Sequence, residues 1–225
     1  AKRQWMFDRD PKEPAFRLNY RILVFFAVDL YEAVMTTKLN GAKTFFFPFN
    51  QGSNGPGNDG GAGNPETKDG DYVTSYLWKD VLQKDSLLDI LQKFVNFEVK
   101  KEKTVLEDGT YKEVTKKSLI FPRYHQMDAV RKLVKDVREH GPGKNYLIQH
   151  SAGSGKSNSI AWTAYRLASL HNDKNEPVFT SVVIVTDRTV LDQQLQDTIS
   201  GFDHTLGSVV TIDEKKNSKD LRDAL

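Results

Sequence analysis

The sequence predicts an α/β protein whose second half, residues 119–225, is a doubly wound domain with a parallel sheet. Apolar residues at helical spacing between 127 and 137 precede the short apolar strand Tyr146-Leu147-Ile148, and a glycine-containing turn then leads into a second helix. The continuous apolar run Val182-Val183-Ile184-Val185 is typical of a parallel strand covered on both faces. A further helix near residues 190–199 and a strand at 208–212 continue the alternation, which favours this architecture.

The composition indicates a folded protein without a metal-thiolate site. Hydrophobic residues make up 38% and charged residues 28% of the 225 residues, and 0 cysteines exclude disulfides. No apolar run approaches the roughly 18 residues that span a bilayer, and the charged start lacks a signal sequence. We therefore expect no membrane partner and a cytoplasmic location. The net charge of +2 requires any nucleic-acid surface to be local.

The first 50 residues predict a small, mostly antiparallel sheet. Aromatic and β-branched runs at 22–28, 33–37 and 44–47 are typical of strands, and Asn40-Gly41 is a turn signal. Residues 51–70 then hold close to half of the chain's 15 glycines. Two interpretations stay open for this segment: a mobile loop, or a loop that wraps a partner domain or nucleic acid.

Residues 71–118 predict two short helices and a basic hairpin. The apolar pattern between 72 and 97 is helical, with a break near Asp85-Ser86. Asp108-Gly109 is a hairpin signal between two strand-like runs. Lysines make this hairpin basic: Lys100, Lys101, Lys103, Lys112, Lys116 and Lys117. We expect it to bridge the preceding segment and the domain at 119–225.

The run from His150 to Ser157 predicts a phosphate-binding loop between a strand and a helix. Glycines let successive N–H groups face a phosphate chain, and the helix N-terminus adds its dipole. Lys156 would reach the β- and γ-phosphates of ATP, and the Ser157 hydroxyl would ligate Mg²⁺. The loop residues expected to bind ATP are Ser151, Ala152, Gly153, Ser154, Gly155, Lys156 and Ser157. The alternative is a glycine turn with a solvated lysine, and His150 departs from the general pattern, which has glycine or alanine there.

Two further segments supply candidate contacts. Gln126 follows Phe121-Pro122-Arg123 about 30 residues before the loop, and its amide suits the N6 and N7 edge of adenine. Arg123 is assigned to the same ATP site. Thr186 and Arg188 follow the apolar run at 182–185, at the sheet edge where ligands bind, and are candidate DNA-phosphate contacts. The alternative for Arg188 is an ion pair with a neighbouring aspartate.

One pattern mimics a metal nuclease. Asp89 followed by Glu98-Val99-Lys100 has the form D…E-x-K. A chance match is expected in a segment crowded with lysine and glutamate, and Asp89 falls on a predicted helix. We therefore assign no catalytic residue within this chain.

Taken together, these motifs resemble the motor (R) subunit of type I restriction-modification enzymes. Phe121 to Gln126, His150 to Ser157 and Thr186 to Arg188 look like that family's adenine, phosphate-loop and first DNA-contact motifs, and His150 is usual there. Further stretches look like its segment between nuclease and motor: Phe26-Ala27-Val28-Asp29, Met35-Thr36-Thr37, Phe47-Pro48-Phe49-Asn50, Gly61-Ala62-Gly63-Asn64-Pro65 and Tyr76-Leu77-Trp78. Gln4 to Pro11 looks like the segment just after the nuclease catalytic residues.

The resemblance implies an internal fragment of such a subunit. Residues 1–50 would be the end of a nuclease domain, 51–70 a glycine-rich loop, 71–118 a helical and hairpin linker, and 119–225 the front of a RecA-like motor lobe. The nuclease carboxylates and the acidic Mg²⁺ motif would lie outside it. ATP, Mg²⁺, double-stranded DNA and the methyltransferase and specificity subunits are the implied cofactors and partners. The intact protein would couple ATP-dependent translocation to DNA cleavage.

Two alternatives stay open at this point. One is a superfamily 2 helicase or translocase without nuclease activity. The other is a non-catalytic module that binds nucleotide only to brace an assembly.

Overall fold

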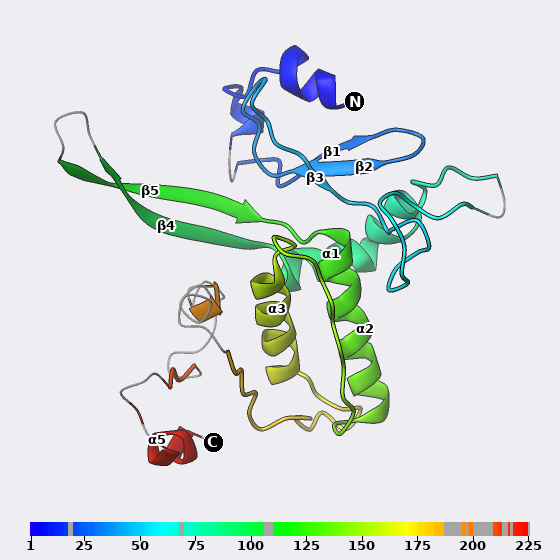
Figure 1. Cartoon of the computed structure of the whole chain (residues 1–225). Coiled ribbons are helices and arrows are strands. Elements are labelled where there is room, and N and C mark those ends of the chain that lie inside the picture. Colours follow the sequence, from blue (N-terminus) through cyan, green and yellow to red (C-terminus); the bar gives the residue numbers. More distant parts are fainter. Residues whose placement is uncertain are drawn as a thin grey trace. The chain divides into compact units, whose positions relative to one another are not determined.

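The computed structural model describes residues 1–17, 20–67, 70–105, 110–186, 195–196, 198–199, 209–212, 216 and 218–224 (Figure 1). These residues form two compact units, Ala1–Ala129 and Val130–Leu225.

The first unit begins with two short helical turns, η1 (Gln4–Asp8) and η2 (Pro14–Phe16), followed by a three-stranded antiparallel sheet. Its strands are β1 (Phe25–Val28), β2 (Ala33–Thr36) and β3 (Phe47–Pro48), in that order. The predicted antiparallel sheet is confirmed, although β3 begins later than the run at 44–47. Thr44 accounts for the delay, because its Oγ1 accepts from the Asn40 N–H and donates to the Gly41 carbonyl. Gly41 has φ +55°, so residues 40–44 form a turn before the strand starts.

An aromatic cluster forms the core of this unit. Phe49 is fully buried, and its ring lies 5.1 Å from Phe26, 6.4 Å from Phe121 and 5.9 Å from Tyr124 between centroids. The Tyr76 hydroxyl donates to the Phe49 carbonyl at 2.8 Å, and burial raises the Tyr76 pKa. The sheet, the helical segment near Tyr76 and the start of the next long helix therefore share one core.

The glycine-rich segment closes on itself. Gly52 N–H donates to Gly63 O at 2.8 Å, Ser53 N–H donates to Gly61 O at 3.0 Å, and Gln51 N–H donates to Asn64 Oδ1 at 2.9 Å. Gly52 and Gly63 have φ +93° and +108°, a region that side chains rarely adopt. The described part of the segment thus has its own hydrogen-bond network.

Two helices and the predicted hairpin follow. The helices are η3 (Leu77–Val81), a single π-helical turn, and α1 (Lys84–Lys93). The break lies at residues 82–83 and not at 85–86, because the Leu82 N–H bonds back to Leu77 O at 2.8 Å and Gln83 is extended. The hairpin consists of β4 (Asn96–Val105) and β5 (Tyr111–Ile120), paired from Asn96↔Ile120 to Val105↔Tyr111. The hairpin prediction is confirmed, while its turn at Asp108-Gly109 lies outside the described residues.

The second unit contains α3 (Lys156–Ala168), α5 (Ser218–Ala224) and most of α2 (Tyr124–His140). The predicted apolar face of α2 is buried at Val130, Val134 and Val137. The helix ends at Gly141, whose N–H donates a hydrogen bond to the Val137 carbonyl at 2.8 Å. Gly141 has φ +74°, the left-handed conformation that is common at helix C-termini. None of the helices described is both long and apolar enough to cross a membrane.

The predicted parallel sheet is not seen in the described part of the chain, whose strand pairs are all antiparallel. The runs at 146–148 and 182–185 are irregular and unpaired there. Leu147 is 91% and Val185 is 87% exposed. Apolar sequence alone does not make a strand, because each strand needs a neighbour for its N–H and C=O groups. The predicted helix at 190–199 and strand at 208–212 lie partly outside the described residues.

Candidate nucleotide-binding site

The predicted phosphate loop is a turn that ends directly in a helix. Residues 151–155 form the turn, and α3 begins at Lys156 with Gly155 as its N-terminal cap. Gly153 and Gly155 have φ +72° and +82°, so both glycines supply left-handed backbone that other residues adopt at a cost. The Asn158 N–H already bonds to Gly155 O at 3.1 Å, so the helix is established within one turn of the loop. The N-terminus of α3, with its first N–H groups, therefore lies directly at the loop. A helix N-terminus in this position favours a bound anion.

Lys156 and Ser157 are the first two residues of α3. The Lys156 ammonium donates to the carbonyls of His150 at 3.0 Å and Ser151 at 2.9 Å, so this side chain folds back across the loop. Lys156 is exposed and Ser157 is half-buried. A flexible ammonium and a hydroxyl at the first turn of a helix fit the donor set for a Mg²⁺-nucleotide: the ammonium for phosphate oxygens, the hydroxyl for the metal.

His150, which departs from the general pattern, is half-buried just before the loop. Burial, and second the charge of Lys156, lower the pKa of His150 below its ordinary value of 6.5. The imidazole is therefore neutral at physiological pH, so it adds no positive charge beside the lysine.

This leads to a prediction for the titration of His150. We expect its NMR midpoint below 6.5, with stability from this group present above that pH and lost as the pH falls through the folded pKa. Lys156→Ala should raise the midpoint only in part, since burial is the larger cause. The His150→Gln variant lacks the His150 imidazole resonance, and this loss identifies that resonance in the NMR spectrum. A midpoint that Lys156→Ala leaves unchanged contradicts the predicted electrostatic contact.

The predicted adenine residues lie in the first unit, at the start of α2. Gln126 is 2% exposed, and its Oε1 accepts from the Arg123 N–H at 2.9 Å. Gln126 is the third residue of α2, so this is the reciprocal bond of a helix N-terminal capping box. The Arg123 guanidinium lies over the Phe47 ring at 4.3 Å, and burial lowers the pKa of Arg123. Gln126 thus has a structural role, and adenine recognition remains a prediction for it.

Paired substitutions separate these two roles of Gln126. Gln126→Ala removes the cap and should lower the free energy of unfolding by about 1–2 kcal/mol. Gln126→Glu keeps an acceptor oxygen at a helix N-terminus that favours negative charge, so it should retain more stability. Both variants lose the amide N–H₂ and should lose preference for ATP over GTP in calorimetric titrations. A selectivity that survives in Gln126→Glu limits Gln126 to capping the helix.

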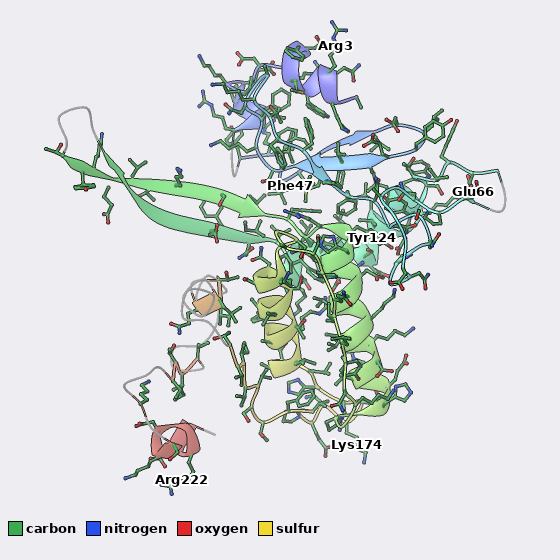
Figure 2. All side chains as sticks on the ribbon, in the orientation of Figure 1. Arg3, Phe47, Glu66, Tyr124, Lys174 and Arg222 are labelled. Carbon is green, nitrogen blue, oxygen red and sulfur yellow. The ribbon has the colours of Figure 1, made fainter. Side chains whose placement is uncertain are left out.

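Two contacts beside Gln126 were not predicted from the sequence. Phe47 stacks under Arg123, and the Gln51 side-chain amide donates to the Tyr124 hydroxyl at 2.9 Å. Figure 2 labels Phe47, from β3, and Tyr124, the first residue of α2. In the sequence, only the motif Phe47-Pro48-Phe49-Asn50 had indicated that residues of this region matter. The sheet and the glycine-rich loop therefore both contact the helix turn that carries Gln126.

The other predicted positions are only partly described. Thr186 is half-buried and directly follows the irregular run 182–185, and Arg188 lies outside the described residues. Asp89 lies on α1, while Glu98 lies on β4 and accepts from Ser118 Oγ at 3.2 Å. Among the residues that the structure describes, no group of three His, Asp or Glu side chains could hold a metal ion.

Comparison with known proteins relates these motifs to restriction enzymes. Residues 125–225 match the family model of SWI2/SNF2 ATPases. The endonuclease subunit of the type I restriction enzyme HindI from Haemophilus influenzae is 32% identical over 124 residues, which cover 55% of this chain and 11% of that protein. An endonuclease subunit ascribed to the type I restriction enzyme MjaVIIIP from Methanocaldococcus jannaschii is 27% identical over 147 residues. This match covers 60% of this chain and 13% of that protein. No solved structure gives a significant match.

The two relatives are much longer than this chain, which spans about a tenth of their length. The ATPase match begins at His125 and contains the whole phosphate loop. The resemblance predicted from the motifs is confirmed: this chain is similar to the endonuclease subunits of type I restriction enzymes, and residues 125–225 match the SWI2/SNF2 ATPases.

Proposed function

We propose that this chain binds Mg-ATP as part of a motor that moves double-stranded DNA in a type I restriction enzyme. The observation that carries the proposal is the turn with Gly153 and Gly155 at positive φ, which leads directly into a helix beginning Lys156-Ser157. This local backbone supports phosphate binding, and the ATPase family match covers it.

The chain's own residues would divide the work of binding. Backbone N–H groups of residues 153–157 would hold the β-phosphate, and Lys156 would exchange its contacts with the loop carbonyls for phosphate oxygens. Ser157 would hold Mg²⁺, which neutralises phosphate charge when bound. Arg123 and Gln126 would contact the adenine side of the nucleotide.

The proposal extends to the activity of the whole protein. In it, ATP hydrolysis would drive translocation of duplex DNA, with Thr186 and Arg188 on the DNA backbone, and translocation would be coupled to cleavage. The methyltransferase and specificity subunits would be its partners. The names of both relatives as type I restriction endonuclease subunits support this assignment.

Two measurements test the proposal. Isothermal titration of the chain with Mg-ATP should show saturable binding, and absence of binding overturns the ATP role. In the whole subunit, ATP hydrolysis should rise when duplex DNA is added. A rate of ATP hydrolysis that does not change when duplex DNA is added contradicts the motor function. It favours a module that binds nucleotide only to brace an assembly.

A further inference from the structure

The outer part of β5, in the described half of the hairpin, is exposed. Leu119 at its base is 5% exposed, whereas residues 111–113 and 115–117 of β5 are exposed. Figure 1 shows β4 and β5 as a long two-stranded ribbon. A two-stranded ribbon alone is marginally stable in water, so a long exposed one is costly to keep without a binding role.

The ribbon is basic along both strands. β4 and β5 together hold six lysines and three glutamates, a net charge of +3, which exceeds the +2 of the whole chain. The register pairs Lys100 with Lys116 as Cα partners. The excess of lysine over glutamate in these two strands suits an anionic partner.

The lysines of β5 also lie on both faces of the ribbon. Lys116 and Lys117 are consecutive in the strand and both exposed, so they point to opposite faces. Lys112 shares the face of Lys116, four residues away along the strand. A flat partner surface would cover one face of the ribbon and leave the lysines of the other face in water. A partner with a groove that receives the ribbon would contact the lysines of both faces.

We infer that the outer hairpin, β5 residues 111–117 with their β4 partners, is a contact surface for the phosphate backbone of duplex DNA. The major groove of B-DNA, about 12 Å wide, admits a two-stranded ribbon, and lysines on its two faces then meet the phosphates of the two walls. Such contacts position a protein on DNA without reading sequence. The inference rests on the proposed function as a DNA motor, and it adds a second contact surface apart from Thr186 and Arg188.

Salt-dependent binding to duplex DNA tests this surface. The triple variant Lys112→Gln, Lys116→Gln, Lys117→Gln is compared with the matched control Lys12→Gln, Lys43→Gln, Lys84→Gln, whose three lysines are exposed in the same unit. The probe is a short labelled duplex of unrelated sequence, followed by fluorescence anisotropy between about 50 and 200 mM salt. We expect the slope of log K against log salt to flatten by about 3 in the hairpin variant, roughly 1 per lysine, with little change in the control.

Single variants test the geometry. Lys116→Gln and Lys117→Gln should each flatten the slope by about 1, because the groove contacts both faces. An effect confined to one of them overturns binding in a groove. Equal slopes in the hairpin and control triples overturn the contact surface itself. Displacement of the duplex by poly-glutamate at equal charge overturns the DNA assignment and favours an acidic protein.

The same samples distinguish this inference from the proposed function. Circular dichroism and thermal unfolding show that each variant is folded, and Mg-ATP titration measures the phosphate loop independently. If the hairpin lysines do not affect duplex binding while Mg-ATP binds, only the inference fails. If they do and Mg-ATP does not bind, only the ATP role fails.

Discussion

Lys156→Ala is expected to weaken Mg-ATP binding by a hundredfold or more. Lys156 is the one cation of the phosphate loop, and removal of one partner of a charged hydrogen-bonded pair costs about 2–5 kcal/mol. Isothermal titration of the chain measures this loss directly. In the whole subunit, the same substitution should abolish DNA-stimulated ATP hydrolysis.

The matched control is Lys174→Ala, an exposed lysine of the same unit that is distant from the loop in sequence. It should leave Mg-ATP affinity unchanged. Lys156→Ala should alter the free energy of unfolding by less than about 1 kcal/mol, since its bonds to the His150 and Ser151 carbonyls are exposed. Equal affinity in the wild type and Lys156→Ala would show that the lysine is merely solvated.

Phe49→Ala should cause the largest loss of stability, about 3–5 kcal/mol, the usual range for truncating a buried phenylalanine. Phe49 is 0% exposed and contacts the rings of Phe26, Phe121 and Tyr124. Chemical unfolding followed by tryptophan fluorescence measures the change. Because Tyr124 opens α2, the substitution should also loosen the turn that holds Gln126.

Phe45→Ala serves as its control. Phe45 is 68% exposed, although its ring lies 4.9 Å from that of Phe47, so its removal should cost less than about 1 kcal/mol. Similar losses for the two variants would mean that the aromatic cluster is not the core of the first unit.

Local signals predicted the parts of the fold that depend on near neighbours. Asn40-Gly41 marked the turn between β2 and β3, and the hairpin signal at Asp108-Gly109 predicted the pairing of β4 with β5. Antiparallel strands need only a short connection. The phosphate loop was likewise visible, because two glycines before a lysine and a serine define its backbone. β3 was placed early because nothing in Thr44-Phe45-Phe46 showed that the Thr44 hydroxyl would bond within the turn.

The parallel sheet is the part of the predicted fold that the described residues do not show. The run Val182-Val183-Ile184-Val185 has the composition of a buried strand, but burial requires neighbouring strands that composition cannot supply, and Val185 is 87% exposed. The bond from the Arg123 N–H to Gln126 had only half of the capping-box signature in the sequence, because Arg123 stands at the cap position where serine or threonine is usual.

The aromatic cluster also bears on how the protein should be divided for biochemical work. A truncated protein that begins at residue 119 would keep Phe121 and Tyr124 but lose Phe49 and Phe26, against which they pack. Two side chains that are 5% exposed would then face solvent and give the sample an adhesive apolar patch. Preparations of the ATPase segment should therefore retain residues from β1 onward if they are to stay monodisperse at the concentrations that crystallisation needs.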